Sequence, residues 1–592
     1  MKLSVSPDLS STRRLLLAAF AVAGVLSILF ALKLDVRSHL GDTDDAMRLV
    51  MVRDLLAGHG WYDQWIARLN PPSGLYMHWS RLVDGGIASL ISILRLAAPP
   101  VTAEWLARVT WPLLWIFPAV ASALWLARNL GARSAVLTTA VLLVVNLESY
   151  RQFLPGRIDH HNIQIVMTLI ALAAATSPRR QLACAVIAGA ASAIGLAVGL
   201  EGLFVQAIVG ASWAIRLAFD RRQAGPAAAY GAMLAAGAAA LFLIQTPPWR
   251  WGVPACDALG ANLVCALTIS GLGLCAVAGL ASRLPTIGRF AALGVTAAIA
   301  AGAYVAFDPT CLHGPFAAVE PLAHRLWLDG VEEIQPLPVV FKLDRASAID
   351  GLATLVTTLI AAGYLLARRQ TRTPQTMLAV LALFLSCLLA VRFWRTMDYV
   401  AWIGIPLMGV ALSSVAARRL RDLFVPTLAI SIFLSPTSFA VAANSAGKAF
   451  MPSQPRSWAR TSDRCFAPQA YRQLGALPTG TVMSEIDMGS FILAFTPHKA
   501  LIAPYHRISH EVVLTLQAFD APVGDAEPKV RALGATYIVD CRGLALSDRP
   551  GTLGASLRSG APPAWLQPLS PPRATLSIWR VMGGRDSRAS AG

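Results

Sequence analysis

The sequence predicts a polytopic α-helical membrane protein with about thirteen transmembrane helices, followed by a small mixed α/β domain. Of its 592 residues, 55% are hydrophobic and only 14% are charged, whereas soluble domains carry about 25% charged residues. Apolar runs of about 20 residues, the length that crosses a bilayer, recur along most of the chain. The net charge of +17 comes mainly from short Lys and Arg clusters between these runs. That distribution is typical of membrane topology and does not indicate nucleic-acid binding.

The first apolar run extends from Leu15 to about Leu34 and follows three basic residues. Because it is nearly long enough to span a bilayer and lacks a small-residue cleavage site, we interpret it as an uncleaved first helix. The connection near Glu201 is short, so the fifth and sixth runs allow more than one division. The expected helices are centred near Ala23, Phe117, Leu142, Leu169, Ala193, Val209, Ala235, Ile269, Ala297, Leu359, Phe384, Gly409 and Ile430.

The basic clusters predict the orientation. They fall between alternate runs, on the same side as the N-terminus, and the positive-inside rule makes that side cytoplasmic. An odd number of spans puts the C-terminal domain on the opposite side. We therefore expect a multi-pass protein of a bacterial inner membrane with a periplasmic C-terminal domain. The clusters are Arg128 with Arg133, Arg179-Arg180, Arg221-Arg222, Arg283 with Arg289, Arg368-Arg369 and Arg418-Arg419.

Four polar segments remain on the outer side. Three are loops of the predicted membrane domain, residues 1–443, and cover residues 35–104, 150–162 and 307–348. The fourth is the C-terminal region, residues 444–592, where Pro, Gly and charged residues become more frequent. Its apolar runs, such as 491–493 and 537–539, have the length of strands, so we expect a mixed α/β domain.

The eight cysteines include no C-x-x-C pair, which argues against a zinc site built from thiolates. Cys256, Cys311, Cys465 and Cys541 fall in outer segments, where disulfides can form, although their spacing does not fix the connectivity. Several of the other cysteines lie in apolar runs as small core residues.

An acidic cluster follows the first span, with Asp42, Asp44 and Asp45 within four positions. Carboxylates are unfavourable in hydrocarbon, so this cluster is expected at the outer membrane surface. Dense oxygen ligands suit a hard cation such as Mg²⁺ or Mn²⁺. A solvated acidic loop is the alternative interpretation.

A second set of metal-competent side chains lies in Gly156–Asn162. Asp159 and His161 alternate, so an extended turn can direct both toward one ion. The alternative is a helix-capping Asp159 with solvent-facing histidines. Zinc fits less well, because carboxylates dominate the candidate ligands.

Three further outer motifs allow either a functional interpretation or an ordinary structural one. Adjacent acids occur at Glu332 and Glu333, where ordinary surface acids are the simpler explanation. Two arginines in the segment Arg392–Tyr399 lie on the outer side, against the positive-inside bias. Binding of a phosphate group explains this position, and the alternative explanation is snorkelling or pairing with Asp398. For Ser484–Ser490 and Pro504–Arg507, the residues alone do not distinguish a functional motif from an ordinary strand and turn.

Taken together, these motifs resemble GT-C membrane glycosyltransferases, and in particular the catalytic subunit of oligosaccharyltransferase. The resemblance implies thirteen transmembrane helices and a C-terminal domain outside the cytoplasm. It also implies transfer of a glycan from a polyprenyl diphosphate carrier with the help of a divalent metal ion, Mn²⁺ or Mg²⁺.

The resemblance assigns roles to individual residues. Asp44 precedes Arg53-Asp54-Leu55-Leu56 at the family spacing and matches the catalytic aspartate, while Asp159-His160-His161 is similar to the archaeal Asp-His-His motif. Gly330–Pro336 resembles the family's glutamate motif and selects Glu333. The metal ligands implied are Asp44, Asp159 and His161, the catalytic residues are Asp44 and Glu333, and the donor-phosphate ligand is Arg392.

The motif that opens the soluble domain departs from the family. The signature Trp-Trp-Asp-Tyr-Gly is represented by Glu485–Gly489, which keeps only Asp487 and Gly489. Because these aromatic residues are missing, the sequence does not establish that Asn-x-Ser/Thr sequons are the acceptors. It is compatible with protein, glycan and lipid acceptors. The resemblance places Asp487, Gly489, His506 and Arg507 on the acceptor or substrate side.

Two other functions are compatible with the sequence. One is a GT-C transferase that moves a single sugar from a polyprenyl monophosphate to lipid or cell-wall glycan, which the degenerate Glu485–Gly489 motif favours. The other is a lipid or sugar transporter, against which no inverted repeat is evident and few charges lie at mid-membrane depth.

Overall fold

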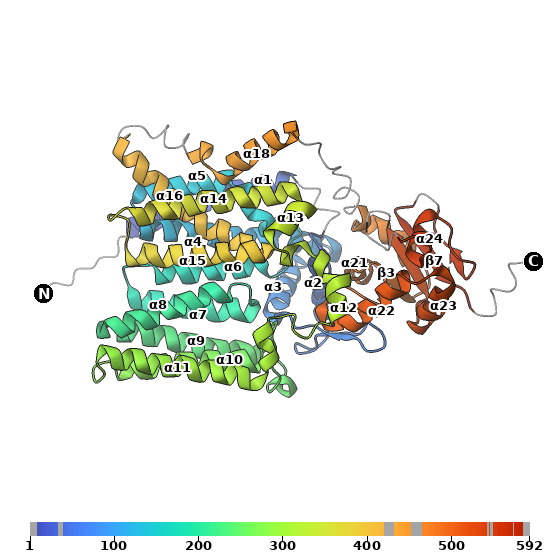
Figure 1. The fold of residues 1–592 in the computed structure, drawn as a ribbon, viewed down its shortest axis with the longest axis horizontal. Coiled ribbons are helices and arrows are strands. Elements are labelled where there is room, and N and C mark those ends of the chain that lie inside the picture. Colours follow the sequence, from blue (N-terminus) through green and yellow to red (C-terminus); the bar gives the residue numbers. More distant parts are fainter. Residues whose placement is uncertain are drawn as a thin grey trace, which may run out of the picture.

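The computed structural model describes residues 9–33, 40–419, 431–450, 464–541, 544, 549–571 and 574–583. Nine helices in these ranges are long and apolar enough to cross a membrane, and they lie side by side in Figure 1. They are α1 (Leu9–Lys33), α4 (Pro100–Leu130), α7 (Gln181–Val198), α9 (Ala224–Gln245), α10 (Ala261–Gly279), α11 (Thr286–Phe307), α14 (Arg345–Ala367), α15 (Pro374–Arg392) and α16 (Met397–Arg419).

Three shorter apolar helices complete the bundle: α5 (Arg133–Val145), α6 (His161–Ala175) and α8 (Leu203–Phe219). The first twelve expected centres all fall inside these helices, which confirms a polytopic helical membrane protein. The thirteenth expected centre, Ile430, lies outside the described residues. The fifth and sixth runs divide at Gly199–Gly202, on either side of Glu201.

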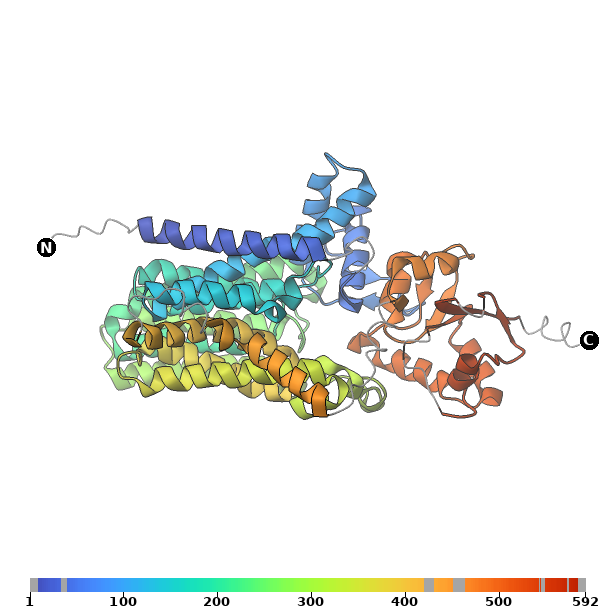
Figure 2. The same ribbon diagram turned by 90° about the horizontal axis from the view of Figure 1, so that it is seen from above.

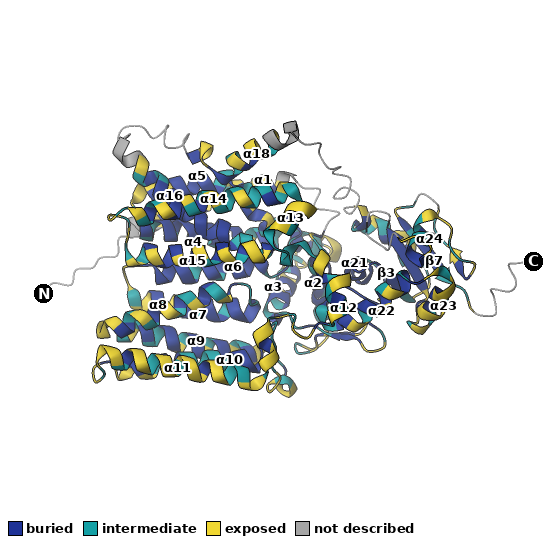
Figure 3. Cartoon of the chain, viewed as in Figure 1, coloured by how far each residue is buried: buried dark blue, intermediate teal, exposed yellow. Residues whose placement is uncertain are grey.

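Small residues let some helices approach closely, as is typical of membrane bundles. A Cβ atom on Gly231 of α9 would lie 2.5 Å from the carbonyl oxygen of Gly271 in α10. At the edge of the bundle, α11 exposes Ile287, Val295 and Ile299 (Figure 3). An apolar exposed face of this kind is suited to contact with lipid.

The outer segments gather at the end of the bundle opposite the N-terminus, next to the C-terminal domain (Figure 1). The first contributes α2 (Thr43–Leu56), a hairpin of β1 (Trp65–Ile66) and β2 (Leu75–Tyr76), and α3 (Arg81–Leu94). The third contributes α12 (Pro321–Leu326) and α13 (Leu337–Leu343). In Figure 2, the blue segment formed by α3 and the start of α4 projects sideways from the bundle.

The C-terminal domain is built on a five-stranded mixed sheet with strand order β4-β3-β5-β7-β6. Strand β3 pairs parallel with β4 and β5, whereas β7 pairs antiparallel with β5 and β6. The strands are β3 (Thr481–Ser484), β4 (Lys499–Ala500), β5 (Tyr537–Cys541), β6 (Leu566–Pro568) and β7 (Leu576–Val581). The longer helices are α21 (Met488–Phe495), α22 (Ser509–Phe519), α23 (Val523–Ala532) and α24 (Leu553–Ser559).

One of the two expected apolar strands is correct and one is wrong. Residues 537–539 belong to β5, but residues 491–493 lie in the helix α21. Every residue of α21 except the last is buried, so this helix carries no polar face that reveals its period. A short apolar run of this kind does not distinguish a buried strand from a buried helix.

The domain boundary expected at residue 443 falls within α18 (Pro436–Phe450). Beyond it, the sheet docks on the first outer segment: the Ala500 amide donates to the Arg68 carbonyl, and the Asn70 amide donates to the Ala500 carbonyl, both at 2.9 Å. The four outer cysteines form two disulfides, Cys256–Cys311 and Cys465–Cys541. Both units therefore meet through an ordered interface at the outer end of the bundle.

Candidate active site between the bundle and the C-terminal domain

A cavity of about 660 Å³ lies where the outer segments meet the C-terminal domain. Five of the nine residues singled out from the sequence line this cavity: Asp44, Glu333, Asp487, His506 and Arg507. Asp159 and His161 do not line it themselves, but His160, which lies between them in the sequence, does, as do Glu201 and Arg395.

The N-terminus of α2 is tied to the segment that carries Asp159. Asp42 caps the helix, accepting hydrogen bonds from the Asp44 and Asp45 amides, while Oδ2 of Asp45 accepts from the Asp42 amide. This reciprocal arrangement is a capping box. The other oxygen of Asp45, Oδ1, accepts hydrogen bonds from the Ile158 and Asp159 amides at 2.6 and 2.9 Å. Asp45 is fully buried, so its role is to hold two segments together.

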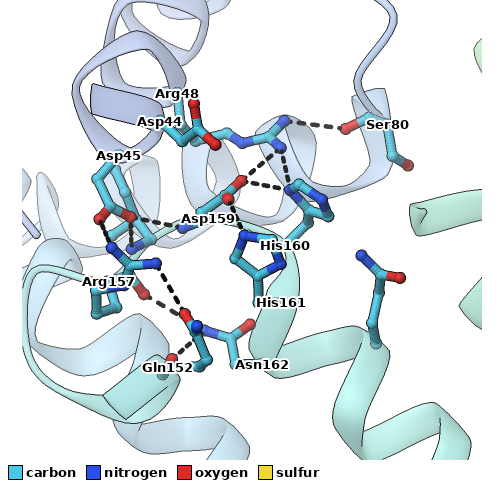
Figure 4. A network of polar contacts seen from close by, with 12 residues as sticks. Asp44, Asp45, Arg48, Ser80, Gln152, Arg157, Asp159, His160, His161 and Asn162 are labelled. Carbon is cyan, nitrogen blue, oxygen red and sulfur yellow. Dashed lines mark hydrogen bonds and ion pairs between the residues drawn. The ribbon is translucent and has the colours of Figure 1, made fainter. Parts of the chain in front are cut away.

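Two arginines neutralise the buried acids of this cluster. Arg157 pairs with Asp42 and, at 3.1 Å, with Asp45. Arg48, which is fully buried, donates to Asp84 at 2.8 Å. It also donates to Oδ1 of Asp159 at 3.1 Å (Figure 4). Buried charges require such partners.

Asp44 differs from its neighbours. Its side chain has no hydrogen bond or ion pair among the described residues (Figure 4). Asp42 and Asp45, by contrast, each have several. Burial raises the pKa of Asp44 well above its usual range, and the negative charges of Asp159 and Asp42 raise it further. An unneutralised carboxylate that faces a cavity is suited to bind a cation or accept a proton.

Asp159 and His161 meet as the sequence predicts. Oδ2 of Asp159 is buried and lies 3.0 Å from Nε2 of His161, while Oδ1 lies 2.5 Å from Nδ1 of His160. Burial alone raises the pKa of Asp159, but the adjacent His160 and His161 outweigh this and hold it well below its usual range. The ligand atoms of all three residues lie within 4.8 Å of one another, so this group is able to hold a metal ion.

The surroundings of His161 also fit a metal ligand. Nδ1 of His161 lies 3.1 Å from the Glu201 carboxylate, and such a pair directs the Nε2 lone pair toward an ion. Burial raises the pKa of Glu201, but His161 and Arg395 outweigh this and lower it to about 2. Neighbouring ligands around an octahedral Mg²⁺ ion are about 3 Å apart, which the separation of Asp159 Oδ2 and His161 Nε2 matches.

Glu333 lines the cavity and Glu332 does not. Oε2 of Glu333 lies 2.6 Å from Nη2 of Arg395, whose Nε lies 3.2 Å from Glu201. Arg395 therefore bridges two acidic side chains from different outer segments. Its Nη2 also lies 3.2 Å from Nε2 of His161.

Arg392 is not brought to this cavity. It ends α15, is exposed, and stacks over the ring of Phe393 at 4.7 Å. Of the two arginines in this motif, Arg395 lines the cavity; it lies three residues later, in a short 3-10 turn that follows the helix. The phosphate-binding role expected for Arg392 stays a prediction, with Arg395 as a second candidate.

The substrate-side residues divide into two kinds. Asp487 lines the cavity at the start of α21, whereas Gly489 does not line it. A Cβ atom at Gly489 would lie 1.8 Å from the Ile502 carbonyl oxygen, so Gly489 permits close packing behind the site. His506 and Arg507 line the cavity and both contact Asp257, at 2.7 Å.

Sequence reasoning missed several residues that build the site. Asp45, Arg48 and Arg157 position the cluster, and their one sequence signal is the Asp-x-x-Asp spacing of a capping box at Asp42 and Asp45. Glu201 and Asp257 have no motif of their own, since their partners lie 40 and 250 positions away. Such pairs become visible only in the folded chain.

The bundle of membrane helices with a C-terminal α/β domain at its outer end is the fold of solved GT-C membrane glycosyltransferases. The archaeal oligosaccharyltransferase AglB from Archaeoglobus fulgidus, in complex with an inhibitory peptide and a dolichol-phosphate, has a TM-score of 0.63 and 15% identity, covering 90% of this chain and 69% of that chain.

Two other structures of the Archaeoglobus fulgidus oligosaccharyltransferase are similar. The one tethered with an acceptor peptide containing the NVT sequon has a TM-score of 0.63 and 14% identity, covering 88% of this chain and 68% of that chain. The complex with Zn and sulfate has a TM-score of 0.61 and 15% identity, covering 89% and 68%. No protein-family model matches the sequence, and no curated protein matches it.

Proposed function

We propose that the protein is a metal-dependent membrane glycosyltransferase. It transfers a glycan from a polyprenyl diphosphate carrier to an acceptor on the side where the C-terminal domain lies, which we assign to the periplasm of a bacterial inner membrane. The observation that supports this proposal is that the unpaired Asp44 lines the cavity together with His160, whose neighbours Asp159 and His161 lie 3.0 Å apart in a group able to hold a metal ion.

Asp44, Asp159 and His161 would hold the metal ion. Two carboxylates and an imidazole suit Mn²⁺ or Mg²⁺, and the 3.0 Å between Asp159 Oδ2 and His161 Nε2 matches the spacing of two neighbouring ligands on one ion. When bound, the ion supplies neutralisation of the charge that develops on the diphosphate leaving group. Glu201 holds the His161 ring in the orientation that this requires.

The protein's own residues support both halves of the transfer. The acceptor nucleophile forms a bond to the anomeric carbon while the bond from that carbon to the diphosphate oxygen breaks, so polyprenyl diphosphate leaves. Asp44 or Glu333 takes the proton from the nucleophile, since both carboxylates line the cavity. Arg395 presents a fixed positive charge toward the leaving group inside the cavity. Arg392 is suited to the carrier phosphates at the membrane surface, outside the cavity.

A second candidate keeps the fold but changes the substrates, moving one sugar from a polyprenyl monophosphate to lipid or cell-wall glycan. It is favoured by Glu485 and Ile486, which replace the two tryptophans of the family signature. Both are buried and neither lines the cavity, so they form no aromatic pocket for a sequon hydroxyl.

The test is transfer of radiolabelled glycan from a polyprenyl diphosphate donor to an Asn-x-Ser/Thr peptide, with Mn²⁺ and with chelator. Metal-dependent glycopeptide would establish the proposed reaction. Metal-dependent loss of donor without glycopeptide would retain the catalytic centre and redirect the search to lipid or glycan acceptors. No turnover of the diphosphate donor would refute it and favour the monophosphate donor.

A further inference from the structure

A second polar cluster lines the same cavity, separated from the metal-competent residues by one aromatic ring. Its centre is Asp257, in the loop after α9, and its other members are His78, His506 and Arg507. The ring of Trp79 lies between this cluster and the first one, with its centroid 6.4 Å from that of His78 and 6.1 Å from that of His160.

The cluster joins three parts of the chain. Arg507 donates from Nε to Oδ2 of Asp257 at 2.9 Å and from Nη2 to Oδ1 at 2.7 Å, and Nε2 of His506 lies 2.7 Å from Oδ2. His78 is left out: its Nε2 is 3.7 Å from Asp257, beyond hydrogen-bond distance, and its Nδ1 is buried without a hydrogen-bond partner. An imidazole left unpaired beside a cavity has capacity for a ligand.

A further cation borders this cluster. The guanidinium of Arg250 lies over the ring of Tyr76, 4.3 Å from its centroid, and also lines the cavity. Tyr76 and Arg507 line the same cavity as Arg250. Arg250 has no ion-pair partner among the described residues.

The charge balance decides which ligand this cluster favours. Two imidazoles and one carboxylate form a ligand set that zinc uses, and these atoms lie within 4.8 Å of one another. However, Arg507 occupies both oxygens of Asp257, and Arg250 adds a positive charge that no acid of the cluster neutralises. The cluster is therefore positive before any ligand binds, which disfavours a cation and favours an anion.

We propose that Arg250, with His78, His506 and Arg507, forms a subsite for a negatively charged group, a carboxylate or a phosphate, on the transferred glycan. This inference rests on the proposed function, because the donor's diphosphate is assigned to the Asp44 and Asp159 side. A glycan attached there extends past Trp79 toward Arg250, and the rings of Trp79 and Phe316 offer faces against which sugar rings stack.

The experiment compares two polyprenyl diphosphate-linked disaccharides that differ only in the outer sugar, glucuronic acid or glucose. For the wild-type protein, the KM of the acidic donor is expected to be about tenfold lower, the effect of one charge-assisted contact. Arg250→Ala should reduce this preference to about one, and Arg250→Lys should keep part of it, since the charge remains. Arg95→Ala, which removes an exposed arginine outside the cavity, should keep the full preference. Thermal unfolding checks that each variant is folded.

The outcomes separate this inference from the proposed function. Transfer of the neutral donor by the wild type supports the proposed function whatever happens to the acidic one, and transfer of neither donor refutes that function. Equal KM values for the two donors, or a preference that survives in Arg250→Ala, would overturn the anion subsite. If the lower KM depends on an acidic residue in the acceptor peptide and not on the donor sugar, the assignment of the anion subsite to the glycan would be overturned.

Discussion

The carboxylate of Asp45 in α2 accepts a 2.9 Å hydrogen bond from the backbone amide of Asp159. This bond joins two segments more than 110 positions apart and brings the Asp159 side chain to the end of α2 that carries Asp44. The geometry of the proposed active site therefore depends on a neighbouring acid, Asp45, that is fully buried and does not line the cavity.

Replacing Asp45 should disrupt the contacts that hold α2 and the Asp159 segment together. Asp45→Ala leaves two buried amides without acceptors and Arg157 without one of its partners, and each orphaned group costs about 1–3 kcal/mol. Asp45→Asn keeps Oδ1 for the two amides and should retain more stability and more transfer activity. Thermal unfolding in detergent, measured beside transfer rates, distinguishes the two variants. Wild-type stability in Asp45→Ala would contradict this role.

Asp44→Ala is expected to abolish transfer while the protein stays folded, because this side chain makes no described contact that supports the fold. A loss of at least about a thousandfold fits the removal of a group that acts in the transition state. Asp54→Ala, on the same helix but outside the cavity lining, is the matched control and should remain active. A full-rate Asp44→Ala variant would refute the proposed centre.

Glu201→Gln tests the support behind His161. Loss of the carboxylate that orients the imidazole should weaken Mn²⁺ affinity about 10–100-fold, because Nδ1 of His161 loses a charged partner at 3.1 Å. Calorimetric titration of Mn²⁺ measures this directly, and raised Mn²⁺ should restore part of the transfer rate. Unchanged Mn²⁺ affinity would show that Glu201 does not support a metal ligand.

The two arginines after α15 should behave differently. Arg395→Ala should lower kcat for the diphosphate donor by about a hundredfold or more, because it removes a cation inside the cavity that two acids hold in place. Arg392→Ala should mainly raise the donor KM, since Arg392 lies outside the cavity. Steady-state kinetics with one donor at varied concentration separates these effects. A larger loss of kcat in Arg392→Ala than in Arg395→Ala would reverse the assignment.

The raised pKa of Asp487 predicts how the stability of the protein depends on pH. Burial, with the nearby charge of Asp42, raises the pKa of Asp487 from 3.8 to about 6. The folded protein thus binds a proton that the unfolded chain releases, so this contribution to stability is complete below pH 3.8 and is lost as the pH rises through about 6. Asp487→Asn should therefore be more heat-stable than the wild type at about pH 7, with the difference shrinking toward pH 4.

The control for the pH experiment is Asp525→Asn, which changes an exposed acid in α23 of the same domain. Its unfolding temperature should follow that of the wild type across the pH range. A constant difference between Asp487→Asn and the wild type at every pH would mean that Asp487 does not titrate in this range.

The spans were predictable because hydrocarbon imposes one requirement on every helix. Each needs a long apolar run, and this signal survives whatever the neighbours are. The acidic segment and the Asp159 motif were singled out because chemistry-bearing residues stand out in a chain with 14% charged residues. Glu333 was selected only by the family resemblance. The error at residues 491–493 arose where burial on all sides erased the periodicity that separates a helix from a strand.

Sequence alone predicted a polytopic helical membrane protein, the order of its outer segments and five of the residues that line the cavity. Only the tertiary structure decided that Asp45 ties α2 to Asp159, that Glu201 supports His161, and that Arg395 lines the cavity. Hydropathy is a property of contiguous residues and can be read along the chain. A hydrogen bond or an ion pair depends on distances of a few ångströms between segments that only folding brings together.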